Sequence, residues 1–123
     1  MFDREMVLEI LQQIHDAARR VLLRFDPVSK VEDFTKSEKG MEKLDGIAML
    51  LIAVGESLKN IDKLTGNSLL DRYPEIDWKG AKGMRDIISH HYFDIDAEEF
   101  FWVCKHQMKP LADTIAKIIE DIK

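Results

Sequence analysis

The chain has 123 residues, of which 46% are hydrophobic and 33% are charged. This composition excludes a disordered or fibrous chain and predicts one globular domain that spans residues 1–123. The longest apolar run, residues 47–54, is far shorter than the ~20 residues that a membrane-spanning helix needs, so we expect no membrane association. The single cysteine, Cys104, excludes an intramolecular disulfide, and the charged N-terminus is unlike a signal peptide, which favours a cytoplasmic protein.

The net charge is −5 and the isoelectric point is near 5.3. Proteins that bind nucleic acid irrespective of sequence are normally basic, because neutralisation of phosphate charges dominates that kind of affinity. Any contact with RNA is therefore expected to depend on a local site and not on the charge of the whole chain.

Apolar spacing predicts helices from the first residues onward, and no stretch alternates in the way a strand would. The first helix is expected from about Asp3 to about Phe25, and the residue before Pro27 ends it. Its apolar stripe comprises Met6, Val7, Ile10, Leu11, Ile14, Ala17, Ala18, Val21, Leu22 and Phe25. A short helical turn follows over residues 31–36, in which Val31 and Phe34 are expected to pack inward.

The second helix is the longest, from about Ser37, its N-cap, to about Leu64. Because residues 47–54 are apolar on almost every face, this helix is expected to be buried on several sides. Gly55 lies inside it, and the expected reason is close approach of another backbone. Gly66 suits a left-handed C-cap, after which residues 68–73 form one more turn.

The third helix is expected from about Trp78 to about His91, capped by Asp77. Its predicted buried stripe is Trp78, Ala81, Met84, Ile87 and Ile88. Asp96 with Glu99 forms a capping-box pattern before a last helix over residues 97–122, which Pro110 should kink. The sequence thus predicts an all-α bundle of four main helices with a few short turns.

The chemically capable side chains gather in the third helix, where Arg85, His90 and Tyr92 form the pattern Arg-x-x-x-x-His-x-Tyr. RNA is cleaved without a metal when a 2′-hydroxyl is deprotonated and the charge on phosphorus is stabilised. Histidine is suited to the proton transfer, and the planar guanidinium of arginine is suited to holding the phosphate. Positions five apart lie about 140° apart around a helix, however, so Arg85 and His90 do not share a face. Either the helix ends at His90, or a two-fold dimer brings two copies of the motif into one cleft.

The motif and its upstream landmarks resemble the HepT-like proteins of the HEPN superfamily. The resemblance covers nearly the whole chain and is carried by Gly55-Glu56, Pro74-x-Ile76-x-Trp78, Gly83-Met84-Arg85-Asp86, His90-x-Tyr92 and Asp96. It implies a helical bundle that forms homodimers, and a metal-independent ribonuclease that acts as the toxin of a type VII-like toxin–antitoxin pair. The implied partner is an MNT-type nucleotidyltransferase antitoxin, which transfers AMP onto the motif tyrosine, and the implied substrate is RNA such as tRNA or mRNA.

By the same resemblance, Arg85 and His90 are the catalytic residues and Tyr92 is the AMP acceptor. Asp86, Ser89 and Glu56 are expected to support them, and no metal or cofactor is expected. Adjacent histidines diverge on a helix, so the pair His90-His91 does not form a convincing metal site.

Three questions stay open at this point. Glu56 is either a solvated residue or the partner of a cation such as Arg85. Lys79 and Lys82, three positions apart, form either a solvated face or a track for the RNA backbone. The chain as a whole is either the ribonuclease or a non-catalytic helical module that docks a nucleotidyltransferase.

Overall fold

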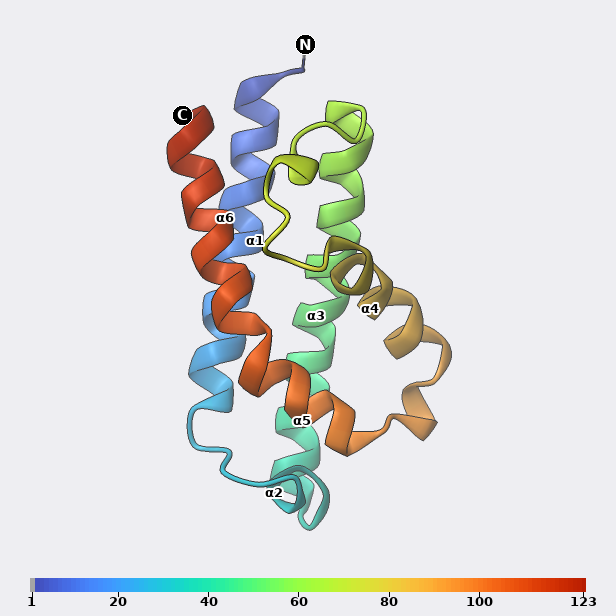
Figure 1. Ribbon diagram of the computed structural model, residues 1–123. Helices are drawn as coiled ribbons and strands as arrows, with labels where there is room; N and C mark the ends of the chain where they lie inside the picture. The colour runs from blue at the N-terminus through green and yellow to red at the C-terminus, as the bar shows by residue number, and fades with distance from the viewer. Residues whose placement is uncertain (1) are drawn as a thin grey trace.

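The fold of residues 2–123, seen in a computed structural model, is entirely helical (Figure 1). The α-helices are α1 (Arg4–Phe25), α2 (Glu32–Thr35), α3 (Glu38–Thr65), α4 (Trp78–His90), α5 (Ala97–His106) and α6 (Met108–Ile122). Two 3₁₀ turns, η1 (Leu70–Arg72) and η2 (Tyr92–Asp94), precede and follow α4. The all-α prediction is confirmed, and none of the helices within residues 2–123 is long and apolar enough to cross a membrane.

Helix α3 lies at the centre of the arrangement, because α1, α2 and α4 all pack against it. Helix α6 packs along α1, and α5 contacts both α6 and α1. Figure 1 shows α1, α3 and α6 running along the length of the molecule with both termini at the same end, while α4 lies to one side of α3. The motif helix is therefore held mainly by one neighbour and keeps much of its surface exposed.

The helix ends follow the local signals in the sequence. Asp3, Ser37 and Asp77 each accept a hydrogen bond from a backbone N–H in the first turn of the helix that follows, and Asp96 accepts two. Gly66 ends α3 in the left-handed conformation with φ of +61°, which glycine adopts without steric cost. These ends agree with the predicted ones because capping depends on residues only a few positions apart.

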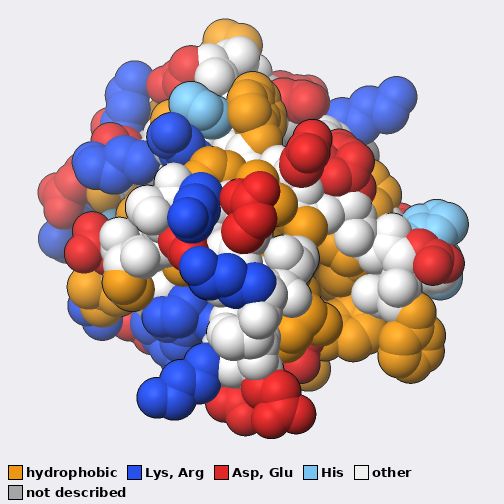
Figure 2. Space-filling view, turned by 90° about the horizontal axis from the view of Figure 1, so that it is seen from below, with side chains coloured by type: hydrophobic (Ala, Val, Ile, Leu, Met, Phe, Trp, Pro, Cys, Tyr) orange, Lys and Arg blue, Asp and Glu red, His pale blue; other side chains and the backbone are white. Residues whose placement is uncertain are grey.

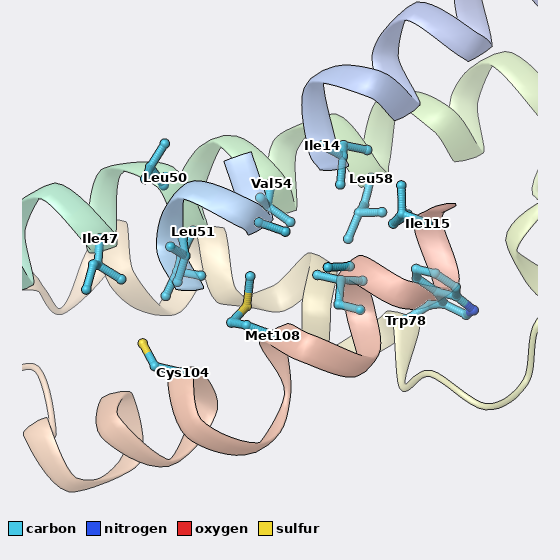
Figure 3. Close-up of a cluster of buried hydrophobic side chains, with 14 of the residues drawn as sticks. Ile14, Ile47, Leu50, Leu51, Val54, Leu58, Trp78, Cys104, Met108 and Ile115 are labelled. Atoms are coloured by element: carbon cyan, nitrogen blue, oxygen red, sulfur yellow. The ribbon is translucent and has the colours of Figure 1, made fainter. Parts of the chain in front are cut away.

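The core fills the space between α1, α3 and α6, and the inner side of α4 closes it (Figure 3). Ile14, Leu58 and Ile115 come from three different helices, are almost fully buried, and point toward one another in Figure 3. At the opposite end of α1, the Phe34 ring lies 6.1 Å from Phe25 and 5.4 Å from Phe100. The expectation that Phe34 packs inward is confirmed, while Val31 is half-buried.

The last predicted helix is not continuous, and this corrects the expected count of four main helices. It divides at Gln107 into α5 and α6, so that Pro110 lies in the first turn of α6. Proline lacks the N–H that would bond to the carbonyl of His106, and its ring collides with that carbonyl in a regular helix. The interruption therefore lies one turn before the proline, where the sequence analysis expected a kink within one helix.

Two residues of the predicted apolar stripes are exposed. Ile87 is 58% exposed, whereas its neighbour Ile88 is buried. Adjacent residues on a helix differ by about 100° in direction, so only one of the pair can face α3. Met6, in the first turn of α1, is 47% exposed for the same geometric reason, because Val7 takes the inward position.

Candidate active site

The motif helix α4 crosses close to α3 at Gly55. A Cβ atom added at Gly55 would lie 3.0 Å from Cβ of Arg85, 3.2 Å from the backbone nitrogen of Arg85 and 3.2 Å from the carbonyl oxygen of Lys82. Ordinary van der Waals contact begins at about 3.4 Å, so only glycine lets α4 come this near. The prediction that Gly55 serves close approach of a backbone is confirmed, and the backbone concerned is that of the motif arginine.

Ion pairs add to this contact between the two helices. Arg85 Nε lies 3.2 Å from Oε2 of Glu56, and Lys59 Nζ lies 3.2 Å from Oδ2 of Asp86. Arg85 Nη1 also donates to Oδ1 of Asp86 at 3.0 Å. Hydrogen bonds from Arg85 and then from Lys59 lower the pKa of Asp86, which keeps its carboxylate ionised. The four side chains form a charge-balanced network that orients the guanidinium of Arg85.

This network answers the question about Glu56. Its side chain is paired with Arg85, which was the second of the two alternatives. The side chain is also 53% exposed and therefore not buried. The contacts of Arg85 use Nε and Nη1, and within residues 2–123 Nη2 has no partner. Because the Arg85 side chain is 40% exposed, the remaining donors of its fork are available to an anion such as phosphate.

His90 is the last residue of α4, and its side chain is exposed. Helix α4 ends at His90, as the first of the two expected explanations required, and His91 has already left the helical conformation, with φ of −126° and ψ of 29°. The end of the helix does not by itself bring His90 to Arg85, because the residues from Trp78 to His90 are all helical. Arg85 packs against Gly55 of α3, and His90, five positions later, lies about 140° away from it around the helix axis. His91 is also exposed, and it lines a hollow together with Met84 and Ile87.

Tyr92 is joined to a residue that the sequence analysis missed. Its hydroxyl donates a hydrogen bond to Oδ1 of Asp45 on α3. That hydrogen bond, with a smaller contribution from burial, raises the pKa of the Tyr92 phenol. Ser89 lies near this pair, because Ser89, Asp45 and Tyr92 all line one open hollow between α3 and the motif segment. Asp45 is 47 positions from Tyr92, and its one sequence signal is helical spacing with Met49 and Glu56 along the same side of α3.

The two lysines of the expected basic stripe have different surroundings. The Lys82 ammonium group pairs with Asp62 on α3, and both side chains are largely covered. Lys79 lies one turn earlier and is exposed. Of the two, Lys79 is therefore the one available for a contact with another molecule. Within residues 2–123, no group of three or more His, Cys, Asp and Glu side chains is arranged to hold a metal ion.

Comparison with known proteins identifies the family of this chain. Residues 7–118 match the family model described as "Ribonuclease HepT-like". A Methanocaldococcus jannaschii protein named "Putative RNase MJ0127" is 26% identical over 98% of this chain and 89% of its own length. Another from the same organism, "Putative RNase MJ1216", is 27% identical over 80% of this chain and 86% of its own length. No solved structure matches the chain.

The chain therefore belongs to the HepT-like ribonuclease family. This membership confirms the resemblance carried by residues 55–96, and with it the prediction that the chain is a ribonuclease.

Proposed function

We propose that this protein is a metal-independent endoribonuclease that acts as the toxin of a type VII-like HEPN/MNT toxin–antitoxin pair in the cytoplasm. One observation carries the proposal. Arg85 of α4 packs against Gly55 of α3 and is oriented by Glu56 of α3 and by its own neighbour Asp86, with Nη2 unpartnered within residues 2–123; an exposed His90 ends α4, in a chain of a ribonuclease family.

In this proposal the reaction is an attack of the 2′-hydroxyl of RNA on the adjacent phosphorus. His90 takes the hydroxyl proton, or gives a proton to the departing 5′-oxygen, as the 2′-oxygen–phosphorus bond forms and the 5′-oxygen–phosphorus bond breaks. Arg85 donates hydrogen bonds to the phosphate oxygens, on which negative charge develops. Glu56 and Asp86 support the reaction indirectly by fixing the guanidinium, and Lys79 supplies a contact to the RNA backbone.

The active site in this proposal is composite and forms at a homodimer interface. Arg85 and His90 diverge within one chain, whereas a two-fold axis beside α4 would duplicate every motif residue across it. Large apolar side chains are exposed around the motif: Phe93 is 98% exposed, Met49 67% and Ile87 58%. Figure 2, a view of the molecule from below, shows hydrophobic side chains gathered on the right-hand side, near histidine side chains. Apolar patches of this kind mark interaction surfaces in soluble proteins.

Regulation follows from Tyr92. We propose that an MNT-type nucleotidyltransferase antitoxin transfers AMP from ATP to the Tyr92 hydroxyl. The phenol is partly exposed, at 39% for the residue, and it belongs to the 3₁₀ turn that begins two residues after His90. A bulky, negatively charged nucleotide at this position would exclude RNA both by its size and by repulsion of the RNA phosphates.

The experiment that tests the ribonuclease proposal is cleavage of total RNA and tRNA in EDTA. Wild type is compared with His90→Ala and with His91→Ala, a matched control because the two histidines are adjacent and both exposed. Each preparation is checked by mass for AMP on Tyr92. We expect cleavage by unmodified wild type and by His91→Ala, and loss of cleavage of about a hundredfold or more in His90→Ala.

Absence of cleavage by unmodified, folded wild type across this RNA panel would contradict the proposed reaction. It would favour the second interpretation of the sequence, a non-catalytic module that docks the nucleotidyltransferase. Unchanged mass after incubation of wild type with the nucleotidyltransferase and ATP would contradict the proposed regulation alone.

A further inference from the structure

The Tyr92 phenol and the Asp45 carboxylate lie together at the edge of an open hollow on the flank of α3 and α4. The hollow has a volume of about 380 Å³ and is lined by Asp45, Ala48, Met49, Ile52, Ile88, Ser89 and Tyr92. Most of the lining is apolar, so the Tyr92–Asp45 hydrogen bond is the main polar feature that faces it. A molecule that reaches the Tyr92 oxygen therefore meets the Asp45 carboxylate at the same time.

We propose that Asp45 is the proton acceptor for transfer of a nucleotidyl group to Tyr92, so that the toxin itself supplies the base for its own modification. This inference rests on the proposed function, because it assigns a mechanism to the modification of Tyr92. The contact that carries it is the hydrogen bond in which the Tyr92 hydroxyl donates to Oδ1 of Asp45.

The step balances without any group beyond a nucleoside triphosphate. A bond forms between the Tyr92 oxygen and the α-phosphorus, and the bond from the α-phosphorus to the bridging oxygen breaks. Pyrophosphate leaves with that electron pair, and the phenolic proton passes to Asp45 and then to solvent. Protein kinases use an aspartate in the same way, to accept the proton of the substrate hydroxyl during transfer to it.

The second tyrosine of the chain shows why accessibility matters. Tyr73 also donates its hydroxyl to an aspartate, Asp121, at 2.6 Å. The Tyr73 side chain is buried, however, at 6% exposure against 39% for Tyr92. The two pairs thus have the same donor and acceptor chemistry, but only the pair on η2 and α3 is open to an incoming phosphorus compound. Tyr73 is therefore a built-in control for any test of Tyr92.

A structural tie is the alternative role for the Asp45 contact, and the two roles predict opposite results. If Asp45 only fastens η2 to α3, its hydrogen bond holds the phenol in the neutral, weakly nucleophilic form, as the raised pKa of Tyr92 indicates. Removal of the carboxylate would then leave the reactivity of Tyr92 unchanged or increase it. If Asp45 accepts the proton during attack, removal of the carboxylate slows the reaction.

The test uses a fluorophosphonate probe, which a phenol attacks at phosphorus with loss of fluoride and a proton. Labelling rates at Tyr92 and Tyr73 are measured by peptide mass spectrometry in wild type, Asp45→Asn and Asp45→Ala, with Tyr92→Phe to confirm the site. Asparagine keeps an oxygen that accepts the hydrogen bond but cannot take up the proton, and alanine removes both properties. Circular dichroism and gel filtration check that each variant keeps its fold and oligomeric state.

We expect Tyr92 labelling to fall about tenfold or more in both Asp45 variants, while Tyr73 labelling stays slow and unchanged. Labelling of Asp45→Asn at the wild-type rate or faster would overturn the proposal, because it would reduce Asp45 to an orienting group. Failure of wild type to react at Tyr92 would overturn it as well. Because the probe needs no nucleotidyltransferase, these outcomes are distinct from a failure of AMP transfer, which the mass assay on wild type reports separately.

Discussion

The close crossing of α3 and α4 at Gly55 leads to the sharpest prediction, a comparison of Gly55→Ala with Gly83→Ala. Both glycines lie inside helices, but a Cβ at Gly83 meets no atom within 4 Å, whereas a Cβ at Gly55 meets Cβ and the nitrogen of Arg85 at 3.0 and 3.2 Å. The same chemical change is thus made once in open space and once against a packed backbone.

The expected magnitudes differ in sign. Alanine is favoured over glycine in a helix interior by about 1 kcal/mol, so Gly83→Ala should stabilise the fold by up to that amount. At Gly55 the same gain is opposed by overpacking, which typically costs about 1–3 kcal/mol because α4 must move by a few tenths of an ångström. We therefore expect Gly55→Ala to be neutral to about 2 kcal/mol less stable than wild type.

The assay is urea unfolding followed by circular dichroism, at one protein concentration for all variants because self-association shifts apparent stability. A gap of at least about 1 kcal/mol between the two variants corresponds to roughly 3–5 °C in melting temperature for a chain of this size. If Gly55→Ala stabilises the protein as much as Gly83→Ala does, α4 does not lie against Gly55, and the orientation of Arg85 deduced from that contact is wrong.

Three other predictions concern single side chains. Glu56→Ala removes the partner of Arg85 Nε. Because this pair is exposed, stability should change by less than about 1 kcal/mol, while RNA cleavage falls several-fold as Arg85 loses orientation. Unchanged cleavage would mean that Asp86 orients Arg85 alone. Pro110→Ala should alter the unfolding free energy by less than about 1 kcal/mol, because the first turn of α6 needs no N–H at that position. An increase of the unfolding free energy by about 3 kcal/mol would show instead that Pro110 strains a continuous helix. Burial and the hydrogen bond to Asp121 raise the pKa of Tyr73 to about 12. Tyr73 should therefore cost wild type on the order of 2 kcal/mol of stability between about pH 10 and 12. When urea unfolding is repeated across that range, the loss should be smaller by this amount in Tyr73→Phe.

Local signals in the sequence determined the helices and most of their ends. Ser37, Gly66 and Asp77 act on backbone groups within the next or preceding turn, so their effect can be read from a few neighbouring residues. The same holds for the content of the motif: the spacing of Arg85, His90 and Tyr92 depends only on the order of residues. The resemblance to the HepT-like family followed from that spacing and the upstream landmarks, and the match to the family model confirms it.

Tertiary contacts decided which side of a helix faces the core. The adjacent pair Ile87 and Ile88 is equally apolar, and only the position of α3 decides that Ile88 is buried and Ile87 exposed. Pro110 predicted a disturbance correctly, and its place follows from local geometry, because the proline ring and its missing N–H disrupt the helix one turn earlier, where it divides at Gln107.

The sequence by itself determined which elements form and which chemical groups the motif contains, because helix propensity, capping and motif spacing act over a few residues. Only the tertiary structure decided which groups meet. The pairs Glu56–Arg85 and Asp45–Tyr92 each join α3 to the motif segment across a long stretch of chain. Such contacts depend on where two helices cross, and that crossing is set by the burial of the whole core and by the absence of a side chain at Gly55.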